Sequence, residues 1–262
     1  MNVIVEGCPA YAYTGGQPFD PGKPAVVLVH GAASDHSLWH YPARYLAHHG
    51  FCVLAIDLPG HGRSPGTART TVAELARWLD AFIAATGVAK ARIAGHSLGS
   101  AVALELALRH PEHVSRLALL GTSAPMPVGE AFLAAAKDGS PAAFDMQATW
   151  GHARQCILAA SPIPGLCLVG AGRQLIARTR PGVQYADLKA CQDWVPDPAA
   201  IRALATPTLV VAGRRDQMTP MRAGRALATE IPGARFTALD AGHNLPVEAA
   251  REVAHALRAA FA

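Results

Sequence analysis

The segment Gly95-His96-Ser97-Leu98-Gly99 places a serine between two glycines in a G-x-S-x-G pattern. A buried strand is expected before it, over residues 91–94, and a helix after it, over residues 100–110. In such a turn the serine backbone is strained and side chains on the flanking positions would clash, which glycine avoids. The turn presents the Ser97 hydroxyl at the carboxyl edge of a sheet, where open α/β folds bind ligands. Ser97 is therefore the candidate covalent nucleophile.

A neutral serine needs a base to accept its proton, and that base needs an acid to orient it. His243 follows an expected strand over residues 234–239, and Asp216 follows one over residues 208–212. Taken alone, a loop aspartate or histidine is usually an ordinary surface residue. Because both stand at strand ends, in the chain order serine, acid, histidine, they predict a catalytic triad of Ser97, Asp216 and His243.

Strand-like and helix-like runs alternate along the two outer parts of the chain. Two short strands are expected within residues 1–14, and further strands over residues 25–29, 51–56, 91–94, 116–120, 208–212 and 234–239. Helices are expected over residues 38–49, 71–86, 100–110, 222–231 and 247–261. This alternation predicts an α/β fold with a mostly parallel central sheet and helices on both faces.

The alternation breaks between residues 124 and 198, where we find no buried strand. Helical stretches, such as those over residues 130–137 and 141–158, alternate with joints rich in proline and glycine, such as residues 161–165. We interpret residues 124–198 as a helical cap inserted into a core domain made of residues 1–123 and 199–262. The prolines and glycines over residues 162–172 indicate a roof that can move over the site.

The motifs together resemble the α/β-hydrolase superfamily, and within it the small capped branch of esterases, lactonases and C–C hydrolases. The resemblance covers roughly residues 20–120 and 205–262, and nothing diagnostic is found in the cap. It is carried by His30-Gly31, Asp57-Leu58-Pro59-Gly60-His61-Gly62-Arg63-Ser64, Gly95-His96-Ser97-Leu98-Gly99, Gly213-x-x-Asp216 and Gly242-His243.

The resemblance implies an oxyanion hole formed by two backbone N–H groups, those of Ala32 and Leu98, because a tetrahedral intermediate needs preorganised donors. It implies a structural role for the loop that contains Asp57, His61 and Arg63, and an organising role for His30. His96 is expected either to touch substrate or to support the turn. The cap residues Trp150, His152, Tyr185 and Trp194 are expected to line the pocket or to form the core of the cap, and no substrate-binding residue is assigned.

The composition of the chain argues against binding to nucleic acid or to a membrane. Hydrophobic residues make up 51% of the chain, and the net charge of +4 comes from scattered arginines, whereas nucleic-acid binding usually needs a clustered basic face. No apolar run approaches the ~18 residues that cross a bilayer, and the first residues lack a secretion signal. We therefore expect a cytoplasmic protein that binds neither nucleic acid nor membrane. The oligomeric state is left open.

Five widely spaced cysteines, with no C-x-x-C pair, indicate reduced thiols and give no zinc pattern. One disulfide among Cys156, Cys167 and Cys191 stays open as an alternative. No metal or other cofactor is expected.

The expected reaction is hydrolysis of a carboxylic ester or lactone, a small molecule with an acyl group, through an acyl-enzyme. Three alternatives stay open: cleavage of a C–C bond in a diketone, cleavage of an amide, and a non-catalytic ligand receptor on the same fold. Dehalogenase and epoxide hydrolase activity is disfavoured, since similar enzymes carry aspartate where this chain has Ser97. The apolar, weakly charged cap predicts a preference for modest-sized, uncharged acyl groups.

Overall fold

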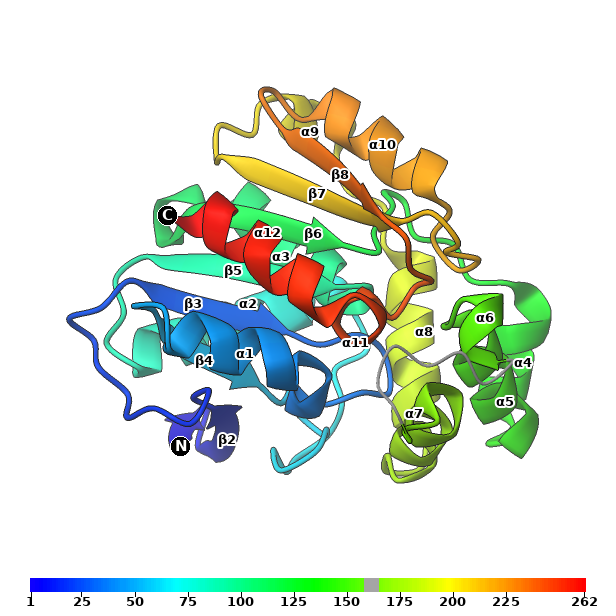
Figure 1. The fold of residues 1–262 in the computed structure, drawn as a ribbon. Helices are drawn as coiled ribbons and strands as arrows, with labels where there is room; N and C mark the ends of the chain where they lie inside the picture. Colours follow the sequence, from blue (N-terminus) through cyan, green and yellow to red (C-terminus); the bar gives the residue numbers. More distant parts are fainter. Residues whose placement is uncertain (158–164) are drawn as a thin grey trace.

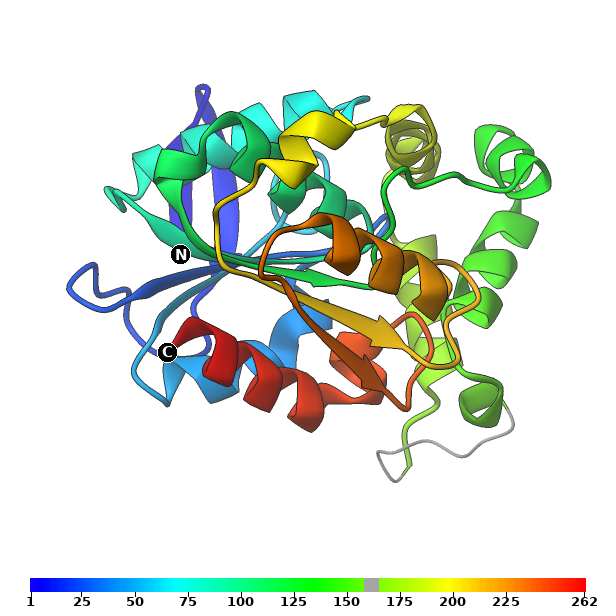
Figure 2. The ribbon, with the colours of Figure 1, turned by 90° about the horizontal axis from the view of Figure 1, so that it is seen from above.

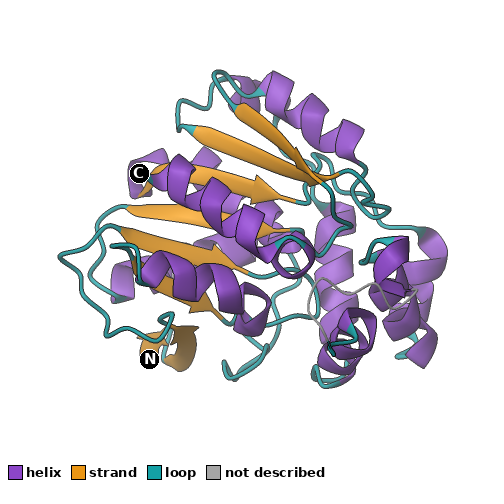
Figure 3. Cartoon of the chain, viewed as in Figure 1, coloured by secondary structure: helices purple, strands orange, loops and turns teal. Residues whose placement is uncertain are grey.

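The computed structural model describes residues 1–157 and 165–262. Within these residues, eight strands form one sheet in the order β1-β2-β4-β3-β5-β6-β7-β8, at the centre of the molecule (Figures 1 and 3). Strand β2 is antiparallel to β1 and to β4, and the pairs from β4 to β8 are all parallel. The strands are β1 Asn2–Val5, β2 Cys8–Tyr13, β3 Ala25–Val29, β4 Cys52–Ile56, β5 Ala91–His96, β6 Val114–Leu120, β7 Thr208–Gly213 and β8 Arg235–Leu239. The predicted mostly parallel sheet is confirmed.

The central strands are apolar along their whole length because helices cover both faces of the sheet. Every residue of β3, β4 and β7 is buried, whereas the edge strand β8 is only half-buried. The uninterrupted runs of valine, leucine and isoleucine in these strands follow from burial on both sides.

Helices on the two faces belong to two separate apolar clusters. Helices α2, α3 and α10 pack on one face, and α1 and α12 pack on the other, as Figure 2 shows from above. Their bounds are α1 His40–Ala47, α2 Val72–Ala85, α3 Leu98–Arg109, α10 Met221–Glu230 and α12 Ala250–Phe261, with the short helices η1 His36–Trp39, η2 Pro111–His113, α9 Pro198–Arg202 and α11 Leu245–Glu248 between them. Helix α2 begins with a capping box, in which Thr71 accepts from the Glu74 N–H and Glu74 accepts from the Thr71 N–H.

Between β6 and β7 the chain forms further helices, which gather beyond the carboxyl ends of the parallel strands (Figure 1). We call this set the inserted helices: α4 Glu130–Lys137, α5 Pro141–Trp150, α6 Arg154–Ile157, α7 Leu168–Ala177 and α8 Val183–Asp193. The predicted helix over residues 130–137 coincides with α4. The predicted single helix over residues 141–158 is wrong, because α5 ends at Trp150 and α6 begins at Arg154.

The break after α5 has a packing cause. A side chain at Gly151 would approach the Gln147 carbonyl oxygen to 2.7 Å and the Asn244 side chain to 3.0 Å. The Asn244 N–H donates to the Gly151 carbonyl oxygen at 2.9 Å, so the chain turns here to meet the loop that carries His243.

The predicted joint over residues 162–172 is partly outside the described residues, because 158–164 are not described. Its second part is wrong, since helix α7 begins at Leu168 and includes Gly170 and Gly172. A side chain at Gly172 would lie 3.0 Å from the ring of His152, so this glycine allows close helix packing.

The predicted helix over residues 247–261 is likewise divided, because Ala249 has a non-helical backbone, with φ −129° and ψ 47°, between α11 and α12. The division turns Glu248 inward, where its Oε2 accepts from the N–H groups of Gly242 and Ala153, at 3.0 Å each.

All five cysteines lie in the described part of the chain and are free thiols, so the alternative disulfide does not form. Among the helices of residues 1–157 and 165–262, none combines the length and apolar character that crossing a bilayer requires.

Candidate active site

Ser97 lies in a sharp turn between β5 and α3. Its backbone has φ 54° and ψ −121°, a conformation that is unfavourable for any residue with a side chain. A side chain at Gly95 would overlap the Gly99 carbonyl, and one at Gly99 would overlap the carbonyl oxygens of Val29 and His30. Glycine at both positions is therefore required for the turn to pack against the end of β3.

Hydrogen bonds on both sides hold this turn. The Ser97 N–H donates to the Leu120 carbonyl oxygen at 2.9 Å, and the Ser97 carbonyl accepts from the Ser100 hydroxyl at 2.6 Å. The Ser97 side chain is left partly exposed and lines a cavity at the carboxyl edge of the sheet.

His243 lines the same cavity, and Asp216 lies behind it. The Nδ1 atom of His243 is 2.8 Å from Oδ2 of Asp216. Oδ1 of Asp216 also accepts from the N–H groups of Met218 and Thr219, and the Thr219 hydroxyl donates to Oδ2 at 2.7 Å. Four donors thus face one buried carboxylate.

These donors keep Asp216 ionised. Burial alone would raise the pKa of Asp216, but the charge and hydrogen bond of His243 and the bonds from Thr219 outweigh burial and lower it. Because an ionised carboxylate only accepts, we assign the His243 proton to Nδ1, which leaves Nε2 as an acceptor on the cavity side.

Close contacts between loops fix the position of His243. A side chain at Gly213 would overlap the Gly242 carbonyl, so the loop after β7 and the loop after β8 approach at their glycines. Gly121, at the end of β6, has φ +55°, and a side chain there would lie 3.1 Å from Nδ1 of His243. The His243 ring is therefore confined between the ends of β6, β7 and β8.

His96 supports the His243 loop from below. Its Nε2 donates to the His243 carbonyl oxygen at 2.8 Å. Burial, and then the nearby His243, lower the pKa of His96 to about 3, so its ring is neutral. His96 also lines the cavity, and both roles expected for it, touching substrate and supporting the turn at Ser97, stay predictions.

Both predicted oxyanion donors belong to residues near Ser97: Leu98 follows it in the chain, and Ala32 follows Gly31, where an added Cβ would lie 3.1 Å from the Ser97 Cβ. Leu98 is the first residue of α3, where an N–H has no acceptor within the helix. Ala32 lines the cavity, and its carbonyl accepts from Nε2 of Gln147 in α5 at 2.8 Å.

Asp57 and His30 organise neighbouring loops. Oδ1 of the fully buried Asp57 accepts from the His36 N–H at 2.7 Å, and Oδ2 accepts from the Arg63 N–H at 2.8 Å. His30 donates from Nδ1 to the Gly31 carbonyl and accepts at Nε2 from the Leu58 N–H. Burial, and then the charge on His61, lower the pKa of His30 to about 4, so it is neutral.

The cavity has a volume of about 590 Å³ and reaches from Ser97 to the inserted helices. Of the aromatic residues proposed from the sequence, Trp150 and His152 line it, whereas Tyr185 and Trp194 do not. The Trp194 indole instead donates to Glu105 at 3.0 Å. Most other lining side chains are apolar: Leu38, Met126, Val128, Phe132, Leu166, Leu168, Leu175, Ile176, Leu188, Met218 and Val247. Among the described lining residues, only Arg178 carries a permanent charge.

Sequence reasoning missed several residues that shape this site. Thr219 and Glu248 bond to the Asp216 and His243 loops, and Gln147 and Asp187 reach the loop after β3 from the inserted helices. In the sequence, a single Asp187 within a helix has no distinguishing signal. Only the packing shows that it is buried.

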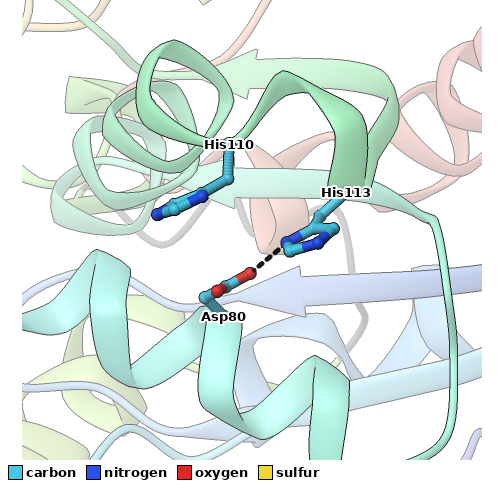
Figure 4. Close-up of side chains that lie close together, drawn as sticks. All are labelled: Asp80, His110 and His113. Carbon is cyan, nitrogen blue, oxygen red and sulfur yellow. Dashed lines mark hydrogen bonds and ion pairs between the residues drawn. The ribbon is translucent and has the colours of Figure 1, made fainter.

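Within residues 1–157 and 165–262, two groups of side chains have donor atoms near enough to share a metal ion. One is Asp80, His110 and His113 (Figure 4), and the other is Asp35, His36 and Asp57. In the first group, Asp80 already pairs with His113 at 2.7 Å. This group lies by the amino end of β6, whereas Ser97 lies at the carboxyl ends of the strands. In the second, His36 pairs with Asp57 and Asp35 caps η1, so protein groups already satisfy these atoms.

Comparisons with known proteins agree with this arrangement. The family model described as alpha/beta hydrolase fold matches residues 24–250. The pimeloyl-[acyl-carrier protein] methyl ester esterase of Aromatoleum aromaticum is 32% identical, over 84% of this chain and 91% of that protein. The dihydrolipoyllysine-residue acetyltransferase component of the acetoin cleaving system of Cupriavidus necator is 39% identical over 111 residues, which are 42% of this chain and only 28% of that protein.

Among solved structures, the enol-lactonase from Burkholderia xenovorans superposes with a TM-score of 0.87, covering 100% of this chain and 99% of that one. At 22% sequence identity, this likeness concerns the fold alone.

Proposed function

This chain is a hydrolase that belongs to the α/β-hydrolase family, and on that premise we propose that it cleaves carboxylic esters or lactones through an acyl-enzyme on Ser97. The observation that carries the proposal is the meeting of three groups at one cavity. Ser97, in its strained turn, and His243 line the same space, and Asp216 bonds to the far side of the His243 ring.

In the proposed reaction Ser97 Oγ attacks the substrate carbonyl carbon while Nε2 of His243 accepts the hydroxyl proton. Asp216 holds the ring in one tautomer and stabilises the imidazolium that forms. The N–H groups of Ala32 and Leu98 would stabilise the negative oxygen of the tetrahedral intermediate. His243 then protonates the leaving alcohol, and water activated by the same ring releases the acid and restores Ser97.

We further propose that the inserted helices act as a cap, so that the chain divides into a core of residues 1–123 and 199–262 and a cap of residues 124–198. The cavity between Ser97 and these helices is mostly apolar, which favours uncharged acyl groups of modest size over charged ones.

Ester turnover by Ser97→Ala tests the nucleophile. We expect p-nitrophenyl butyrate hydrolysis to fall by about 10⁶-fold, as for other serine triads, and a fluorophosphonate to label the wild type but not the variant. Ser115→Ala is the matched control, because Ser115 sits at the start of β6 and bonds to the Ala91 carbonyl. Labelling at another serine, with undiminished turnover by Ser97→Ala, would rule the assignment out.

A panel of esters from acetate to palmitate, with lactones and a diketone, tests the substrate class. Turnover of short and medium esters or lactones supports the proposal. Turnover of the diketone alone would move the assignment to C–C hydrolysis, and a clear preference for palmitate would contradict the modest acyl size.

A further inference from the structure

The loop after β3, which carries the proposed oxyanion donor Ala32, is bonded to the inserted helices. The carboxylate of Asp187, in the middle of α8, is fully buried. Its Oδ2 accepts from the Ala33 N–H at 2.8 Å and from Nε2 of His61 at 2.8 Å. One side chain from the cap therefore joins two core loops, 154 and 126 positions away in sequence.

A second contact reaches the same loop from α5. Gln147 donates to the Ala32 carbonyl oxygen at 2.8 Å, and its own Oε1 accepts from Gln184 of α8 at 2.7 Å. The peptide group that joins Ala32 to Ala33 is thus held at both ends by cap side chains, its carbonyl by Gln147 and its N–H by Asp187.

This loop needs external support because of its backbone. Ala33 has φ +49°, which is unfavourable for a residue with a side chain. Such a conformation persists only where surrounding contacts determine it. The bond from the Ala33 N–H to Asp187 is one such contact, and it sits directly beside Ala32.

The partner of Asp187 is a cationic imidazole. Nδ1 of His61 faces the Pro59 carbonyl oxygen at 3.1 Å and Nε2 faces Asp187, so both nitrogens must donate. Burial alone would lower the pKa of His61, but the charge and hydrogen bond of Asp187 outweigh burial and raise it. Asp187 and His61 form a buried ion pair beneath the cap.

We propose that Asp187 is a positioning residue that couples the cap to catalysis: the Ala32 N–H points at the oxyanion only while α8 and α5 hold the loop. This inference rests on the proposed hydrolase mechanism. Its consequence is that an enzyme in which α8 and α5 no longer contact the loop after β3 loses one oxyanion donor. The cap position that encloses the substrate is then also the position that completes the oxyanion hole.

Asp187→Asn tests the coupling, because the amide keeps the size of the side chain and removes its charge. We expect kcat for p-nitrophenyl butyrate to fall by ~10- to 100-fold, below the ~10²–10³ that loss of a whole oxyanion donor costs, with KM changed less than about threefold. A trifluoromethyl ketone, whose adduct carries an oxyanion, should lose affinity in proportion to kcat/KM, while the affinity for butyrate stays unchanged. Asp193→Asn is the matched control, since Asp193 is an exposed residue of the same helix that pairs with Lys189.

Amide hydrogen exchange at Ala33, followed by NMR, tests the contact without any substrate. Exchange should be slow in the wild type and in Asp193→Asn, and faster in Asp187→Asn. Unchanged Ala33 exchange, or a fall in kcat with no loss of ketone affinity, overturns the proposal. If wild-type enzyme turned over no ester or lactone, the proposed function would fail, and Ala33 exchange would still decide whether the cap holds the loop.

Gln184→Ala provides a second variant should Asp187→Asn not fold. It removes the support of Gln147 without changing a residue that lines the cavity. We expect a smaller fall in kcat, about three- to tenfold, again matched by the ketone. Wild-type kcat and ketone affinity in a folded Gln184→Ala would contradict the role of the α5 contact.

Discussion

Among the described residues, two aspartate–histidine pairs have a buried carboxylate that follows a parallel strand at the carboxyl edge of the sheet. After β7, Asp216 lies 2.8 Å from Nδ1 of His243, and after β4, Asp57 lies 2.9 Å from Nδ1 of His36. Both carboxylates are inaccessible to solvent, and both also accept backbone N–H groups. By composition and geometry the two pairs are nearly the same.

They differ in what the imidazole meets on its other side. His243 lines the cavity beside Ser97, whereas His36 does not line it and packs its ring against Tyr11, with centroids 4.9 Å apart. An aspartate–histidine pair can thus orient a base or fasten a loop. Under the proposed mechanism, the position of each pair relative to Ser97 decides which role it has.

Replacing each histidine by glutamine is the strongest test of this difference. His243→Gln should lower kcat by about 10⁴- to 10⁶-fold, because no group remains to accept the Ser97 proton. His36→Gln should leave kcat within about threefold and lower only the melting temperature, since it loses one bond to Asp57. Ester kinetics with both variants, beside thermal melting, give the measurement. Comparable losses of kcat in the two variants would erase the distinction.

The aspartates give the next largest contrast. Asp216→Asn should lower kcat by about 10³- to 10⁴-fold, the range for a triad whose histidine takes the wrong tautomer. Asp57→Asn should keep kcat within tenfold, and should destabilise the fold by about 1–3 kcal/mol because one buried N–H loses its acceptor. Urea denaturation and kinetics separate the two effects. An inactive but stable Asp57→Asn, with Asp216→Asn near wild type, would exchange the two assignments.

Features of the fold that depend on a short stretch of sequence could be predicted. The buried strands and the turn at Ser97 could be predicted because valine-rich runs and paired glycines have few other uses. The distinction between Asp216 and Asp57 came from chain order and from resemblance, since both follow a buried strand.

Long-range packing was beyond such reasoning. The division of the expected helices at Gly151 and Ala249 arises because the His243 loop packs against both segments. Likewise, the burial of Asp187 depends on α8 lying over the loop after β3, which no periodicity within α8 reveals.

Replacing a glycine beside each aspartate–histidine pair should have a smaller effect, which again differs between the two pairs. Gly121 and Gly62 both have positive φ, and a side chain at Gly121 would press on Nδ1 of His243. One at Gly62 would overlap the Asp57 carboxylate. Gly121→Ala should lower kcat about tenfold by displacing the ring, and Gly62→Ala should reduce stability while each folded molecule keeps its activity.

Gly87→Ala is the control for the backbone cost alone, about 1–2 kcal/mol for a side chain in this conformation. Gly87 has φ +77° and nothing within 4 Å of an added side chain. If Gly121→Ala changed stability like Gly87→Ala and kcat not at all, His243 would be less confined than the contacts indicate.

The smallest expected effect is on stability in acid, where the two pairs should behave alike. Burial alone would raise the pKa of Asp57, but the hydrogen bond from His36 and the nearby His30 outweigh it and lower the pKa, as happens at Asp216. A carboxylate whose pKa is lowered by folding stabilises the native state at pH values above its unfolded pKa of ~3.9. That stabilisation is lost as the pH falls through the lower pKa of the folded state.

The difference in unfolding free energy between wild type and Asp57→Asn should therefore be largest near pH 6 and shrink steadily towards pH 3, and the same should hold for Asp216→Asn. Urea unfolding at several pH values measures both differences. A gap that stays constant for one variant would mean that folding does not lower the pKa of its carboxylate, and that the two pairs differ in electrostatic environment as well as in position.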